Sequence, residues 1–267
     1  MKSGRSEKMP YSLSRWTDVP AAKWVWFKIQ LQQGHMMAFD QRTAIPSKWS
    51  LAPEDTLGLI FWTRDPTNLI KDVDLLAPYE KVIHLTVTGW EEVEHAAPDL
   101  QEGVKLLETT VETFGQKNVV WRFSPVPLVD DVLPRFERIA TQVGRIAPGM
   151  TVYLSFLQEN DRVPETRGLK VRTELTRHLN RLAGEHGLNL RVCMEDAVAT
   201  SLKHLGGVCE DGQRFGAGYT DGCGCCMAVD PFTVNESCVF GCEFCYAADL
   251  ETSPKKRNTT RGLPIIR

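Results

Sequence analysis

The amino-acid sequence predicts an α/β protein, a partial or complete TIM-like barrel of about six βα units with a cysteine-rich C-terminal region. Short apolar runs alternate with helical patterns up to about Asp196, which is typical of parallel βα units. Beyond that residue, glycine and cysteine dominate, and all eight cysteines lie between Cys193 and Cys245. We therefore expect a barrel over residues 1–198 and a cysteine-rich region over 199–267, packed on the barrel rim.

Six runs rich in β-branched and aromatic residues mark the expected strands. They cover residues 11–14, 58–63, 82–88, 119–123, 151–157 and 188–194. Helical spacing of apolar side chains follows five of them, with N-cap residues or proline at the start and glycine near the end. The expected helices run from about 20 to 34, from 65 onward, and over 99–114, 130–143 and 169–185.

Polar residues recur where these strands end, which in a parallel barrel is the edge that carries the chemistry. The candidate cofactor-binding residues there are Arg15, Thr17, Asp18, Thr63, Arg122, Ser124 and Glu195. Arginine forms bidentate bonds to carboxylates, so Arg15 with Asp18 could hold a bound cofactor or form a rim salt bridge. Arg122 lies inside an apolar strand, where arginine is rarely buried without a partner.

Aromatic and histidine side chains within the strands have simpler interpretations. Trp62 and Trp121 are expected in the core, and His84 is expected to be an interior side chain with its hydrogen bonds satisfied.

Charge and hydropathy limit the class of partner. The formal net charge of −3 gives no overall attraction to nucleic-acid phosphates. The polar N-terminus has no secretory apolar segment, and no apolar run approaches the roughly 18 residues that span a bilayer. We expect a cytoplasmic protein with no membrane partner.

Three cysteines, Cys238, Cys242 and Cys245, follow a C-x3-C-x2-C spacing. Thiolates this close in sequence can reach one iron–sulfur cluster, and three protein ligands would leave one iron open. A zinc site and unliganded buried thiols are the alternatives.

Four further cysteines are candidates for a second, fully ligated cluster, and a four-cysteine zinc site fits them almost equally well. They are Cys193, Cys209, Cys223 and Cys225. Cys226 is a spare, because adjacent residues of an extended chain point to opposite sides.

The loop from Cys238 to Ala247, with Phe244 before its last cysteine, resembles the cluster loop of radical S-adenosylmethionine enzymes, and most of all that of spore photoproduct lyases. The resemblance implies a [4Fe–4S] cluster whose open iron binds S-adenosylmethionine, with Phe244 beside the cofactor. It also implies an electron donor such as a ferredoxin or flavodoxin, and a substrate that is a small molecule or a nucleic acid. In those enzymes the loop follows the first strand, whereas here it follows the last.

The whole chain resembles a bacterial and phage family of unknown function with cysteines at its C-terminus. The matching stretches are 14–20, 60–66, 120–125, 155–156, 223–225 and 238–247. Trp16 stands where a second arginine is usual, and Cys226 is extra. Two hypotheses follow: a radical S-adenosylmethionine-type enzyme, or a non-catalytic protein in which iron–sulfur or zinc centres are structural.

Overall fold

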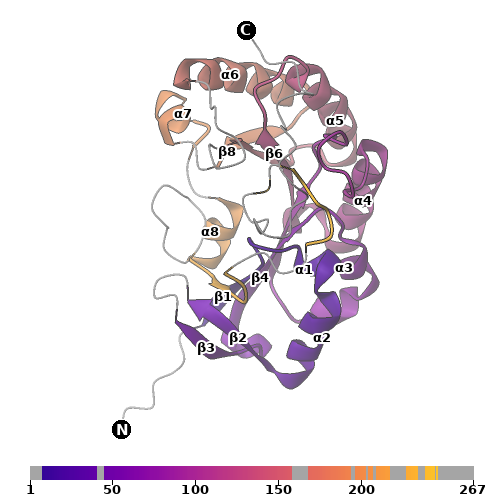
Figure 1. The fold of residues 1–267 in the computed structure, drawn as a ribbon, viewed down its shortest axis with the longest axis vertical. Helices are drawn as coiled ribbons and strands as arrows, with labels where there is room; N and C mark the ends of the chain where they lie inside the picture. The colour runs from indigo at the N-terminus through magenta and orange to yellow at the C-terminus, as the bar shows by residue number, and fades with distance from the viewer. Residues whose placement is uncertain are drawn as a thin grey trace.

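A computed structural model describes residues 8–40, 45–157, 168–193, 196–202, 204–206, 209–216, 227–233, 238–243 and 245. Its centre is an open, mostly parallel sheet of nine strands in the order β3-β2-β9-β1-β4-β5-β6-β7-β8 (Figure 1). The predicted α/β class and the largely parallel sheet are confirmed. Closure of the sheet into a barrel stays a prediction.

Six neighbouring parallel strands form most of this sheet and correspond to the six predicted runs. They are β1 (Met9–Leu13), β4 (Thr56–Thr63), β5 (Lys81–Thr86), β6 (Val119–Val126), β7 (Thr151–Phe156) and β8 (Asn189–Val192). Their interior positions are buried on both faces, which explains why they read as nearly continuous apolar runs.

Three strands were not predicted from the sequence. A hairpin of β2 (His35–Asp40) and β3 (Pro46–Ser50) lies at one edge, and β9 (Val229–Asp230) pairs with both β1 and β2. The edge strand β3 is largely exposed and begins with proline, and β9 has only two residues. β3 lacks the pattern of a buried strand because an edge strand has a neighbour on one side only. β9 is buried between two strands, but two residues are too short a run to show a strand pattern.

The five expected helices are present, and the first of them is divided at Lys23 into α1 and α2. They are α1 (Val19–Ala22), α2 (Trp24–Gln33), α3 (Thr67–Lys71), α4 (Leu100–Phe114), α5 (Val132–Ile146) and α6 (Leu169–Glu185), joined in the C-terminal part by α7 (Asp196–Ser201) and α8 (Glu210–Phe215). Short 3-10 turns occur at Pro53–Asp55, Val73–Leu76 and Gln116–Asn118. The Asp99 side chain accepts a hydrogen bond from the Glu102 amide at 2.8 Å and so caps α4. Gly34 ends α2 in the left-handed conformation.

The two faces of the sheet differ in their cover. Helices α2 to α6 form an arc along one side, and α8 lies on the other (Figure 1). The helix-covered face packs a large apolar core in which Trp121 and Phe123 contact Phe136 of α5. We call the opposite side the α8 face; there a smaller cluster joins Ile60, Val82, Val120, Tyr153, Cys193, Cys209, Phe215 and Ala228.

No helix in the part of the chain that the structure describes is long and apolar enough to cross a lipid bilayer.

Gly58 of β4 allows α8 to approach the sheet. A Cβ atom at this position would lie 2.2 Å from the Phe215 ring, so Gly58→Ala should push α8 away and lower the free energy of unfolding by about 1–3 kcal/mol. Urea denaturation measures the change. The control is Gly184→Ala in α6, where a Cβ meets nothing within 4 Å, and there we expect a gain of about 0.5 kcal/mol. Equal stabilities for the two variants would contradict this packing.

Candidate functional site

The cysteine loop lies on the segment that follows β5. The Glu243 amide donates a hydrogen bond to the Val93 carbonyl at 2.9 Å, and the Ala96 amide donates to the Phe240 carbonyl at 3.3 Å. The His95 ring and the Glu243 carboxylate are 2.8 Å apart. These contacts place the loop against the segment that follows the carboxyl end of β5.

The three thiols of this loop share a partly buried environment. All three side chains are half-buried. Burial raises the pKa of Cys242 to about 12; Arg64 opposes the rise, and the thiols of Cys245 and Cys238 add to it. Burial also raises the pKa of Cys238, where Cys245 again contributes. Cys238 and Cys242 therefore resist ionisation, and a bound metal centre would supply the positive charge that makes them thiolate ligands.

The cysteine loop supplies the thiol groups of a candidate metal centre. Among the described residues, no three or more His, Cys, Asp or Glu side chains converge closely enough to hold one metal ion. Cys238, Cys242 and Cys245 are free thiols, the residue type that both zinc and iron–sulfur centres use.

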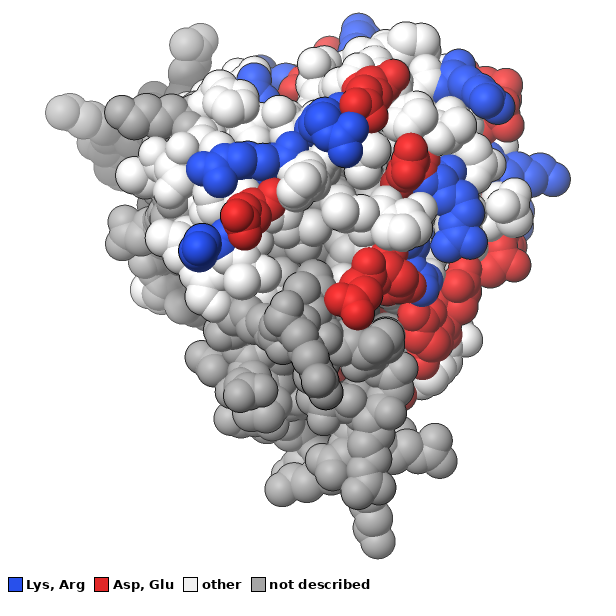
Figure 2. All heavy atoms as spheres, turned by 90° about the horizontal axis from the view of Figure 1, so that it is seen from above, with Lys and Arg blue, Asp and Glu red and all other residues white. Residues whose placement is uncertain are grey.

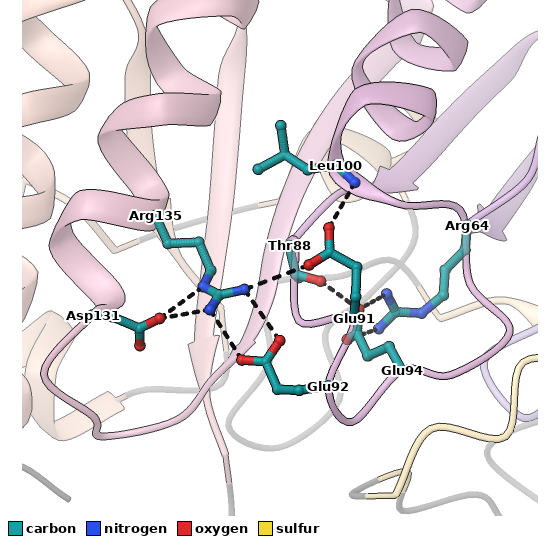
Figure 3. Close-up of polar contacts among 8 residues, drawn as sticks. All are labelled: Arg64, Thr88, Glu91, Glu92, Glu94, Leu100, Asp131 and Arg135. Carbon is teal, nitrogen blue, oxygen red and sulfur yellow. Dashed lines mark hydrogen bonds and ion pairs between the residues drawn. The ribbon is translucent and has the colours of Figure 1, made fainter. Parts of the chain in front are cut away.

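A buried ion pair lies beside Cys242. The Arg64 guanidinium donates two hydrogen bonds to the Glu94 carboxylate, at 2.7 and 2.6 Å, and the Thr88 hydroxyl donates a third at 2.6 Å (Figure 3). Burial raises the pKa of Glu94, and Arg64 and Thr88 oppose the rise. This bidentate pair therefore links the end of β4 to the segment after β5, which carries the cysteine loop.

A second arginine holds the other side of the same segment. The Arg135 side chain of α5 donates to Asp131 at 2.5 Å and to Glu92 at 3.0 Å (Figure 3). Its guanidinium carbon lies 4.1 Å from the centre of the Trp90 ring. Glu91 accepts a hydrogen bond from the first amide of α4. The segment from residue 87 to 99 is thus fixed on both sides.

Asp18 connects the first strand end to the second. Its carboxylate accepts hydrogen bonds from the Ala21 amide at 3.0 Å, the Thr63 hydroxyl at 2.8 Å and the Arg64 amide at 2.8 Å. Burial raises the pKa of Asp18 to about 7, although these hydrogen bonds lower it. The structure thus brings the predicted residues Asp18 and Thr63 together, and Asp18 also shifts the pKa of Cys238. Thr17 is buried next to them in the chain.

The other predicted arginines lie on the α8 face. The guanidinium carbons of Arg122 and Arg15 are 4.9 and 5.6 Å from the centre of the Trp62 ring. His84 stacks on Trp62 with the ring centres 4.1 Å apart and the planes at 6°. Ser124, also predicted for the site, hydrogen-bonds Ser155 on the neighbouring strand.

Two expectations for this face are corrected. His84 is fully buried, yet within the described residues neither ring nitrogen has a hydrogen-bond partner, so it is not the satisfied side chain that we expected. Burial and the charge of Arg122 lower its pKa well below the usual value. Trp62 is half-buried and stacked rather than enclosed in the core. The expectation is confirmed for Trp121, whose indole donates to the Val87 carbonyl at 2.9 Å.

Two of the four cysteines of the expected second centre lie in the apolar cluster of the α8 face. Cys193 and Cys209 are buried in the same cluster as Tyr153, whose hydroxyl accepts a hydrogen bond from the first amide of α8 at 2.9 Å. Four predicted site residues lie outside the described residues: Cys223, Cys225, Glu195 and Phe244.

Sequence reasoning assigned no role to Arg64 or Glu94. Arg64 follows a strand directly, which was a usable signal, but Glu94 lies in an irregular segment 30 residues later. No periodicity links such a pair, because the fold alone brings the two side chains together.

A family described as a domain of unknown function (DUF1848) matches residues 11–247. The chain belongs to this family. The resemblance to a family of unknown function is therefore confirmed, over nearly the same residues. No curated protein matches the chain, and no solved structure matches it either.

The Arg64–Glu94 pair should dominate the local stability of this family member. Arg64→Met leaves a buried carboxylate without its cation and should lower the free energy of unfolding by about 3–5 kcal/mol, measured by urea denaturation. The matched control is Arg181→Met, which breaks an exposed pair with Glu185 and should change stability by less than about 0.5 kcal/mol. Similar losses in both variants would show that the buried pair is not the anchor.

Proposed function

We propose that this protein is a radical S-adenosylmethionine-type enzyme with a [4Fe–4S] cluster held by Cys238, Cys242 and Cys245. The observation that carries the proposal is geometric: the loop with the three cysteines is hydrogen-bonded to the segment after β5, at a polar strand-end edge. The six parallel strands in chain order support the finer architecture that we propose, a partial barrel.

A reduced cluster held by these cysteines would supply one electron to cleave S-adenosylmethionine into methionine and a 5′-deoxyadenosyl radical, the species that would remove hydrogen from the substrate. The chain's own residues would bind the cluster and the cofactor and orient them. Arg64 places a cation beside Cys242, and Glu94 fixes the direction of that guanidinium. Asp18 and Thr63 hold the adjoining turn in shape, and we assign the cofactor to this part of the edge. Partial burial of the thiols limits access of water.

A second centre on the α8 face is part of the proposal. Cys193 and Cys209 would provide two of its ligands, and Cys223 and Cys225 the others. Iron–sulfur and zinc remain alternatives for this centre. A reduced ferredoxin or flavodoxin is the proposed electron donor for the enzyme.

One observation favours the non-catalytic alternative. The cysteine loop forms backbone hydrogen bonds to the segment after β5, far away in sequence. A metal centre in the loop could therefore act as a structural link between distant parts of the chain.

Anaerobic purification tests the proposal. The protein should contain iron and acid-labile sulfide, and S-adenosylmethionine should change the electron paramagnetic resonance spectrum of the reduced cluster. With dithionite, 5′-deoxyadenosine should accumulate slowly without substrate, because only an open iron can accept the amino and carboxylate groups of the cofactor. Cys242→Ala should abolish both responses, and Cys226→Ala should leave them nearly intact.

An intact, reduced cluster that does not respond to S-adenosylmethionine would rule out the radical mechanism and leave the structural role. Zinc in place of iron at Cys238, Cys242 and Cys245 would rule out both the cluster and the mechanism.

A further inference from the structure

A cavity of about 300 Å³ lies at the amino ends of β6 and β7, on the α8 face. Its walls come from the 3-10 turn Gln116–Asn118, the turn before β7 and the start of α8. The cysteine loop, in contrast, lies against the segment after the carboxyl end of β5. The cavity is therefore separate from the candidate site, and its volume suits one small molecule.

Opposite charges line this cavity without neutralising each other. Lys117 belongs to the 3-10 turn, and Glu210 is the first residue of α8. Within the part of the chain that the structure describes, the Lys117 ammonium forms neither a hydrogen bond nor an ion pair. One oxygen of the Glu210 carboxylate is 3.4 Å from the Arg214 guanidinium, and the carboxylate has further lone pairs to accept with. A ligand with one negative and one positive end would match both charges.

Arg214 ties the two charged walls together. Its guanidinium donates to the Asn118 side chain at 2.7 Å and to the Lys117 carbonyl, so that α8 is joined to the 3-10 turn. The Glu210 amide donates to the Tyr153 hydroxyl at 2.9 Å, which holds the first turn of α8 on the sheet. The walls are therefore in place before a ligand arrives, and a preformed site lowers the entropic cost of binding.

The floor of the cavity is apolar. It is formed by Val119, Val120 and Met150, whose side chains are buried. Thr151 lines the cavity as well and adds a hydroxyl that can donate or accept a hydrogen bond. An apolar surface between two opposite charges matches the composition of an α-amino acid.

The charge pattern of the protein favours such a small ligand over a polyanion. Figure 2 shows cationic and acidic side chains interspersed over the described part of one face, and the formal net charge is −3. A nucleic acid needs an extended basic surface. The cavity instead presents a single cation opposite a single carboxylate.

We propose that this cavity binds a free α-amino acid with an apolar side chain. The carboxylate of the ligand binds the Lys117 ammonium and the Thr151 hydroxyl, and its ammonium binds the Glu210 carboxylate. The side chain of the ligand packs on the apolar floor. The site stands on the geometry of the cavity and does not depend on the proposed function.

Titration calorimetry at neutral pH and constant ionic strength tests the site with L-leucine as the probe, which the wild-type protein should bind. Three analogues each lack one recognised group: L-leucinamide the carboxylate, 4-methylpentanoate the ammonium and glycine the apolar side chain. Each should bind at least about tenfold more weakly than L-leucine, because each leaves one part of the cavity unmatched.

Two variants assign the charges to the two ends of the ligand. Lys117→Gln should raise the dissociation constant of L-leucine about tenfold and remove the preference for L-leucine over L-leucinamide. Glu210→Gln should cause a similar loss and instead remove the preference over 4-methylpentanoate. Lys105→Gln, which replaces an exposed lysine of α4, should bind L-leucine as the wild type does. Far-UV circular dichroism establishes that each variant is folded.

The proposal is overturned if L-leucine does not bind at millimolar concentration, or if both cavity variants bind it as tightly as the wild type. Equal binding of L-leucine, L-leucinamide and 4-methylpentanoate would overturn it too, because such a cavity would recognise the apolar group alone. So would a loss of affinity in both variants with the preferences unchanged, since the two charges would then serve only the fold.

Discussion

The buried ion pair between Arg64 and Glu94 is the interaction on which the candidate site depends. Removing two charges from water costs several kcal/mol each, and only good geometry with further hydrogen bonds repays that cost. Here the pair is bidentate and Thr88 satisfies the carboxylate further. The pair therefore determines where the segment after β5 lies, and through Val93 and Ala96 where the cysteine loop lies.

The sheet separates structural from chemical roles by its two faces. One face buries aromatic and aliphatic side chains under α2 to α6 and supplies the hydrophobic stabilisation. The α8 face has a small apolar cluster and then turns polar, with two cysteines, a stacked histidine and two arginines. A parallel sheet can do this because neighbouring side chains on a strand point to opposite faces. The side chains of the α8 face can therefore change in type while those of the helix-covered face continue to stabilise the fold.

The candidate site could be predicted in part. Arg15, Asp18, Thr63 and Arg122 stood out because they end or interrupt apolar strands, and the cysteine loop stood out by its spacing. The sequence did not predict that Asp18 and Thr63 lie together while Arg15 and Arg122 lie on the α8 face. Strand position indicates which edge a residue reaches, but the path of each long side chain depends on the neighbours it meets, as with Arg122 over Trp62.

The sequence by itself determined the class of fold, the six parallel strands, most helix ends and the grouping of the cysteines, since these follow from local periodicity, capping residues and spacing. Only the tertiary structure decided the edge hairpin, the place of β9, the pairing of Arg64 with Glu94 and the stacking of His84 on Trp62. These features join residues far apart in the chain. Such contacts leave no pattern in the sequence, because what selects them is complementary shape and charge after the chain has folded.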